Sequence, residues 1–174
     1  MRSWKAVLIP SFSQRQNAYT SSLVTKKLSE EAVTSWVDYW FDTAMSLDAP
    51  GWWAQMDVYG DPNSGVIATP SYKTSFAHRD KLWLWQLSTV FDTVGDDNQP
   101  QIDFLDGLMN SIKDELPAGA WGRYANYIDT ELDRDEALHQ YYAGNLERLK
   151  GIKTTVDRDD LFHYPQSIPS WYKK

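Results

Sequence analysis

The sequence predicts an α+β fold, in which an antiparallel β-sheet is covered on one face by helices and is followed by an irregular C-terminal tail. Three observations predict this fold class. Apolar residues recur at helical spacing near residues 29–45, 101–116 and 135–155. Aromatic and β-branched residues alternate with a period of two in shorter segments between them. The order of segments contains no repeated strand–helix–strand unit and no glycine-rich phosphate loop, which favours an antiparallel sheet.

The first clear element is a helix that begins after Ser29. Residues 1–28 mix Ser, Thr and Gln with single apolar residues, and we expect them to be irregular. Ser29 can cap the helix, and the two glutamates that follow lie where the positive end of the helix dipole favours them. The apolar stripe of this helix consists of Ala32, Val33, Trp36, Val37, Trp40, Phe41 and Ala44. Pro50 and Gly51 are expected to end the unit.

Three segments are interpreted as strands. In "WWAQMDVYG" one face carries Trp53, Gln55, Asp57 and Tyr59, and the other, expected to be packed, carries Trp52, Ala54, Met56 and Val58. In "KLWLWQLSTVF" one face carries Leu82, Leu84 and Gln86, and the other carries Trp83, Trp85 and Leu87. In "GRYANYID" a strand would place Tyr124 and Asn126 on one face and Tyr127 on the other.

The remaining segments are predicted as two helices and a tail. Residues 101–116 form an amphipathic helix whose inner face is expected to contain Ile102, Leu105, Met109, Ile112 and Leu116. Residues 135–155 form a helical stretch that Gly144 is expected to divide. Its packed side is expected to contain Ala137, Tyr141, Leu149 and Ile152. The tail from residue 157 contains two prolines and is expected to be irregular.

Composition limits the possible functions. The 174 residues suffice for one ordinary domain, with 42% hydrophobic and 24% charged residues. The formal charge is −7, and no Lys/Arg cluster appears, which argues against a nucleic-acid partner. The chain has no cysteine, which excludes disulfides, thiolate metal sites and a cysteine nucleophile. No apolar segment is long enough for a membrane span or a signal peptide, and the sequence indicates no compartment.

Several kinds of catalytic site find little support. His78, His139 and His163 lie far apart without metal-ligand spacing, so no metal site is predicted. No Gly-x-Ser-x-Gly motif is present, which disfavours a serine hydrolase. A glycosidase built from distant carboxylates such as Asp57 and Asp129 stays open, because sequence does not show how far apart they lie.

Polar side chains interrupt each of the three hydrophobic strands. They are Gln55 and Asp57, then Gln86, then Tyr124 and Asn126. A buried polar group costs a few kcal/mol unless it finds a partner. Each of these side chains can have a hydrogen-bond partner within the core. Alternatively, together they can form a polar patch that binds a ligand. The nine tryptophans and ten tyrosines leave a similar choice between an aromatic-rich core and a pocket for a sugar or a flat cofactor.

Two segments resemble a known family. "YANYID" and "YYAGNLERLKGIKTTVDRDDLFHYPQSI" closely resemble the C-terminal berberine-bridge-enzyme-like segment of FAD-linked oxidases. Upstream, "QMDVYG" and "SFAHRDKLWLWQ" resemble the substrate domain of these enzymes, in particular the carbohydrate (oligosaccharide) oxidases. The resemblance covers about residues 28–168. It departs from the family pattern in two turns, at Asp61 and at "DRDD", residues 157–160.

The resemblance implies an enzyme that oxidises a hydroxyl group of a sugar or another alcohol, with oxygen as the final acceptor. Tyr124 matches the general base that removes the hydroxyl proton, and Asp57 matches an aspartate that assists it. An ordinary tyrosine has a pKa of about 10, so a phenolate base needs help at neutral pH. A nearby carboxylate helps by accepting a proton or a hydrogen bond, since its charge disfavours a phenolate. Gln55 and Gln86 match residues that bind the sugar hydroxyls.

The resemblance also implies FAD as the cofactor, with Asn126 and Tyr127 on the flavin side. It divides the chain into a partial substrate-binding domain, residues 1–120, and the berberine-bridge-enzyme-like segment, residues 121–174, packed as one unit. Family members also have an N-terminal FAD-binding domain, and this chain has no counterpart to it. We therefore expect the isolated chain to be inactive as an oxidase, and a separately encoded FAD-binding domain is a possible partner. Many family members are secreted.

Two alternatives stay open beside this interpretation. One is a flavin-free ligand-binding protein or a degenerate remnant that uses its many aromatic side chains to hold a ligand. The other is a non-redox cyclase of natural-product synthesis on the same scaffold. The joint presence of Tyr124, Asp57 and Gln86 favours the oxidase ancestry, because random decay would tend to remove one of them.

Overall fold

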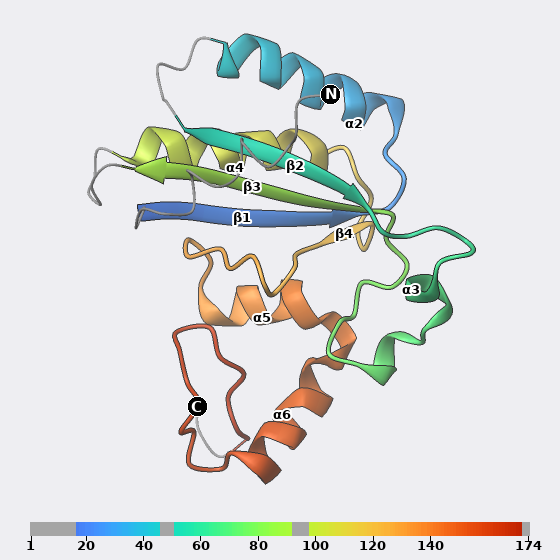
Figure 1. Ribbon diagram of the computed structural model, residues 1–174, viewed down its shortest axis with the longest axis vertical. Helices are drawn as coiled ribbons and strands as arrows, with labels where there is room; N and C mark the ends of the chain where they lie inside the picture. Colours follow the sequence, from blue (N-terminus) through green and yellow to red (C-terminus); the bar gives the residue numbers. More distant parts are fainter. Residues whose placement is uncertain (1–16, 46–50, 92–97, 172–174) are drawn as a thin grey trace, which may run out of the picture.

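The computed structural model describes residues 17–45, 51–91 and 98–171. Four strands form one sheet in the order β2-β3-β1-β4, and every neighbouring pair is antiparallel. The strands are β1 (Asn17–Thr25), β2 (Trp52–Val58), β3 (Trp83–Phe91) and the short β4 (Trp121–Gly122). The α+β class and the antiparallel sheet are confirmed (Figure 1).

Two helices cover one face of the sheet, α2 (Glu30–Tyr39) and α4 (Gln99–Lys113) (Figure 1). Ser29 caps α2 as expected, because its side chain accepts a hydrogen bond from the Ala32 N–H. A π-helical turn, Trp40–Ala44, extends α2. The core between helices and sheet contains Tyr19, Leu23, Trp85, Leu87, Phe104, Leu105, Leu108, Met109 and Ile112.

The rest of the chain lies mainly below the sheet in Figure 1. It comprises α3 (Gly65–Ala68), the 3₁₀ turn Ser71–Lys73, α5 (Arg134–Tyr142), the 3₁₀ turn Ala143–Asn145 and α6 (Leu146–Val156). The predicted division near Gly144 is confirmed. The described part of the tail, residues 157–171, contains no helix or strand. Among the described residues, no helix is long and apolar enough to cross a membrane.

Strand β1 was missed by the sequence analysis, which expected residues 1–28 to be irregular. The described part of that region, from Asn17 on, is a central strand that pairs with β3 along its whole length. Its hydroxyl groups are buried but have partners: Ser21 Oγ donates to Asp129, and Ser22 Oγ accepts from the Tyr124 N–H. These partners are about a hundred residues away, so the local sequence resembles a polar loop.

The expected third strand is also wrong in part. Strand β4 ends at Gly122, and residues 124–127 form a turn in which the Tyr127 N–H donates to the Tyr124 carbonyl over 3.0 Å. Two expected packing faces need correction as well. Met56 and Val58 of the edge strand β2 are exposed rather than packed, and so is Ile152 of α6, because the described residues leave these three side chains open to solvent.

Candidate functional site

The site is formed on the face of the sheet that α2 and α4 leave uncovered. In the sheet register Gln55 of β2 lies directly opposite Gln86 of β3, and Gln86 lies opposite Ser22 of β1. Residues paired in this way share a face of the sheet. The two carboxamides and the Ser22 hydroxyl therefore form one row across three strands, which we call the polar row.

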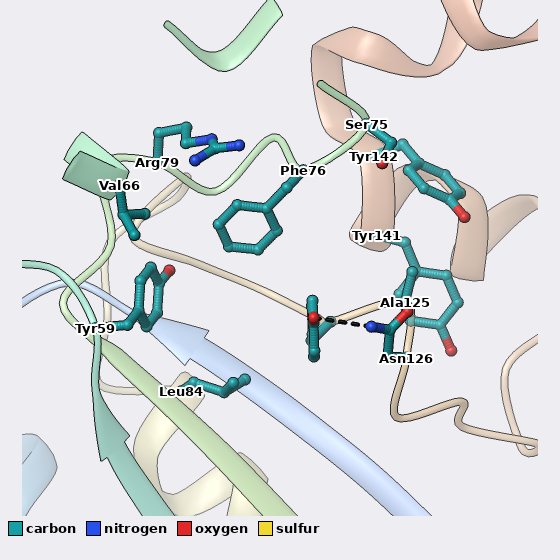
Figure 2. Close-up of a pocket in the computed structure, with 11 residues that line it drawn as sticks. Tyr59, Val66, Ser75, Phe76, Arg79, Leu84, Ala125, Asn126, Tyr141 and Tyr142 are labelled. Carbon is teal, nitrogen blue, oxygen red and sulfur yellow. Dashed lines mark hydrogen bonds between the residues drawn. The ribbon is translucent and has the colours of Figure 1, made fainter. Parts of the chain in front are cut away.

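The polar row continues into the turn after β4. The Tyr124 N–H donates to Ser22 Oγ over 2.9 Å, which fixes the start of the turn against β1. Next in the turn, the Asn126 side-chain amide donates to the Tyr124 hydroxyl over 2.8 Å (Figure 2). The Tyr127 ring meets the Tyr124 ring edge to face at 5.3 Å. The expected proximity of the phenol and the amide is thus produced by a turn rather than by strand alternation.

Asp57 lies two residues along β2 from Gln55 and on the same face. Its carboxylate accepts hydrogen bonds from the Gln55 amide over 2.9 and 3.1 Å. In the register Asp57 lies opposite Leu84, which lines a pocket together with Tyr124. The pKa of Tyr127 is raised by burial and, to a smaller extent, by the charges of Asp57 and Tyr124. The strand acid and the turn therefore belong to one region of the molecule.

The structure thus brings all six predicted site residues to this face: Gln55, Asp57, Gln86, Tyr124, Asn126 and Tyr127. Asp129, the second carboxylate considered for a glycosidase, is not available for such chemistry. It is 1% exposed and forms a buried ion pair with Arg123, with Tyr19 Oη donating to it over 2.9 Å.

A pocket of about 360 Å³ opens beside the turn. Figure 2 shows the ring of Phe76 between Tyr59 and Arg79 on one side and Tyr142 on the other, with Leu84 of β3 below. We call it the aromatic pocket; its lining residues are Tyr59, Val66, Ser75, Phe76, Arg79, Leu84, Tyr124, Ala125, Asn126, Tyr141 and Tyr142. Sequence reasoning missed most of this lining, because the residues come from segments whose contact depends on the fold.

The turn carries an amide and two aromatic rings that fit a flavin. The Asn126 side chain is exposed and uses one amide hydrogen for Tyr124. Its other N–H can donate and its carbonyl oxygen can accept, which suits the alternating carbonyl and N–H groups of a flavin edge. The neighbouring rings of Tyr124 and Tyr127 offer apolar contact to a flat ligand. Among the described residues, no group of three or more His, Asp or Glu side chains is placed to hold a metal ion.

A family model and curated relatives both match this chain to berberine-bridge-like FAD-linked oxidases. The family model "Berberine and berberine like" matches residues 123–169. A carbohydrate oxidase of Microdochium nivale is 40% identical over 153 residues, which is 88% of this chain and 31% of the relative. A glucooligosaccharide oxidase of Sarocladium strictum is 39% identical over 83% of this chain and 30% of its own length. The chain therefore spans about a third of the curated relatives that it matches.

Solved structures agree with the sequence matches. The Microdochium nivale carbohydrate oxidase, solved with a substrate analogue, superposes with a TM-score of 0.81 at 39% identity, over 90% of this chain and 33% of that chain. A xylooligosaccharide oxidase of Myceliophthora thermophila, solved with xylobiose, gives a TM-score of 0.81 at 37% identity, over 92% of this chain and 34% of that chain.

Proposed function

We propose that this chain, which matches the C-terminal part of the berberine-bridge-like FAD-linked oxidases in sequence and fold, is the substrate-binding part of an oxidase that acts on a hydroxyl group of a sugar or another alcohol. The observation that carries the proposal is the convergence of the Tyr124 hydroxyl, the polar row and the Asp57 carboxylate on the face of the sheet opposite α2 and α4. Such a face offers both a proton acceptor and groups that orient hydroxyls.

Tyr124 is proposed as the group that takes the hydroxyl proton. The Asn126 amide donates to the phenol oxygen over 2.8 Å, so it stabilises negative charge on that oxygen. Backbone contact with Ser22 and ring contact with Tyr127 hold the phenol in place. A base that is held in one orientation needs no rearrangement when the substrate arrives.

Asp57 and the carboxamides are proposed to orient the substrate. The Gln55 amide holds the Asp57 carboxylate, which leaves its remaining lone pairs free to accept a proton or a substrate hydroxyl hydrogen. Gln86, in the middle of the polar row, can both donate to and accept from neighbouring hydroxyls. The exposed face of Trp53 on β2 is suited to stack on a sugar ring.

The cofactor proposed for this chemistry is FAD, with Asn126 and Tyr127 as contacts from this chain. When bound, a flavin supplies the acceptor for the hydride that leaves the carbon of the oxidised alcohol. The glucooligosaccharide oxidase of Acremonium strictum, one of the similar solved structures, has a 6-S-cysteinyl, 8α-N1-histidyl FAD. A separately encoded FAD-binding domain as partner remains part of the proposal.

A chimera tests the proposed function. Residues 17–171 would replace the matching part of the Microdochium nivale carbohydrate oxidase, and hydrogen peroxide formation would be measured on sugars and other alcohols. We expect Tyr124→Phe to lower kcat by about 100-fold or more, with the flavin absorbance unchanged. Tyr164→Phe, which removes a hydroxyl outside the site, is the matched control. A flavin-loaded chimera with full activity despite Tyr124→Phe, or without any alcohol oxidation, would refute the proposal.

A further inference from the structure

We propose that the aromatic pocket binds a sugar ring that carries an anionic group, and that Arg79 recognises the charge. The inference deepens the proposed function and rests on it for the sugar ring, whereas the preference for an anion is carried by the pocket itself. None of the three residues of the polar row lines this pocket, while Tyr124 and Asn126 do. A ring held here would therefore lie beside the proposed base and separate from the polar row.

The pocket has the size and the walls for a ring. Its volume of about 360 Å³ falls in the range of small-molecule pockets, roughly 300–1,000 Å³. The Phe76 ring meets Tyr59 edge to face at 5.8 Å and Tyr124 at 5.8 Å. Burial raises the pKa of Tyr59 and raises that of Tyr142 to about 12. These phenols therefore stay neutral near pH 7 and do not repel an anion.

Arg79 supplies a positive charge that no carboxylate of the described residues neutralises through an ion pair. Its guanidinium lies 5.2 Å from the Phe76 ring centroid, and its Nη2 donates to Thr74 Oγ1 over 2.6 Å. The neighbouring acid, Asp80, is held instead by Lys26 and Lys81 at 3.1 and 2.8 Å. The Arg79 Nε is buried and has no hydrogen-bond acceptor. The guanidinium lines the pocket, and its one printed partner is the neutral Thr74 hydroxyl, so an anionic acceptor in the pocket is favoured.

The walls of the pocket are fixed by the C-terminal helices. Asn145, at the junction of α5 and α6, donates to the carbonyls of Ser71 and Thr74 over 2.8 and 3.3 Å. Arg148 of α6 donates to the Tyr72 carbonyl. The segment that carries Thr74, Ser75 and Phe76 is thus held in place, so a ligand does not have to order it on binding.

Calorimetric titration of the 174-residue chain tests the inference. The probes are methyl β-glucuronide and methyl β-glucoside, which share a ring and differ in the carboxylate. We expect the glucuronide to bind about tenfold more tightly at low salt, with a smaller ratio at high salt. Arg79→Gln should bring the ratio to about one, and Arg79→Lys should retain part of it. Arg134→Gln, on an exposed arginine at the start of α5, should leave the ratio unchanged.

Equal binding of the two probes, a ratio that survives in Arg79→Gln, or no binding of the glucuronide would overturn the inference. Thermal unfolding of each variant shows whether it is folded. The proposed function is tested separately, since Gln86→Ala should weaken binding of neutral oligosaccharides, whereas Arg79→Gln should not. Neutral binding that depends on Gln86, without any preference for the charged probe, would refute the anion site and leave the proposed function intact.

Discussion

At the scale of single residues, the turn that carries Tyr124 is clamped at both ends by a buried ion pair. Arg123 and Asp129 flank the turn, and Arg123 donates to Asp129 Oδ2. Asp129 also accepts from Tyr19 Oη and Ser21 Oγ, at 2.9 and 2.6 Å. A charge-assisted network of this kind costs a great deal to break, because the remaining partner is left buried and unpaired.

We therefore expect Asp129→Asn to lower the free energy of unfolding by about 3 kcal/mol or more. The reason is that Arg123, a residue only 7% exposed, keeps its charge and loses its counter-ion. Glu147→Gln removes one partner of the more exposed Lys150–Glu147 pair and should cost less than about 1 kcal/mol. Urea unfolding measures both values, and similar costs for the two variants would contradict the assignment of a buried clamp.

His78 is a buried group that ties the segment before β3 to α5, with its Nε2 at 2.9 Å from the Gln140 carbonyl. Burial lowers its pKa below the ordinary value of 6.5. As the pH falls through 6.5, the unfolded chain therefore takes up a proton before the folded chain does. The contribution of neutral His78 to the free energy of unfolding is therefore present above pH 6.5 and is lost as the pH falls below it.

Below about pH 6.5 the free energy of unfolding should fall less steeply with decreasing pH in His78→Gln than in the unaltered chain. We expect the slope to be smaller by up to about 1.4 kcal/mol per pH unit. Gln Nε2 can still donate to the Gln140 carbonyl. His163→Gln, at an exposed position, is the control. Urea unfolding at a series of pH values gives the slope, and an unchanged slope in His78→Gln would show that the buried histidine does not limit acid stability.

At the scale of elements, the end of β2 depends on a close approach of two backbones. The N–H groups of Tyr59 and Gly60 both donate to the Leu82 carbonyl over 3.1 Å. A Cβ at Gly60 would lie 1.9 Å from the Lys81 carbonyl oxygen, which is a backbone atom that cannot rotate away. This contact sets the position of Tyr59, one wall of the aromatic pocket.

Gly60→Ala should therefore destabilise the fold by about 1–3 kcal/mol, because the two segments have to move apart. Gly65→Ala, where a Cβ meets nothing within 4 Å, should change stability by less than about 1 kcal/mol. Thermal unfolding compares the two. If both substitutions are equally mild, the segments are not in the tight contact described here.

The elements also show how far the sequence could predict the site. The alternation of side chains correctly predicted that Gln55 and Asp57 share one face of β2. It also correctly predicted that Gln86 and Leu84 share one face of β3. It could not give the register that sets Gln55 opposite Gln86, because register depends on pairing between strands. The turn at Tyr124 was mistaken for a strand, since Arg123, Ser22 and Asp129 hold it through contacts that local sequence does not contain.

At the scale of the whole molecule, the chain offers a flavin one exposed amide and neighbouring rings at the turn. We expect so few contacts to retain no flavin. The 174-residue chain purified by itself should therefore show no visible flavin absorption band, and it should form no hydrogen peroxide with a sugar. A yellow, flavin-loaded preparation would contradict this prediction and would indicate that the chain binds the cofactor without an FAD-binding domain.

The proposed function requires that a sugar binds on the sheet face opposite α2 and α4. The most direct measurement is a titration of the chain with xylobiose, followed by the NMR signals of assigned side-chain amides and indoles. We predict saturable shifts for Gln55, Gln86 and Trp53, while the indole of Trp85, buried on the helical side, does not shift. Shifts confined to the helical side, or none at Gln55 and Gln86 at saturating sugar, would contradict the account.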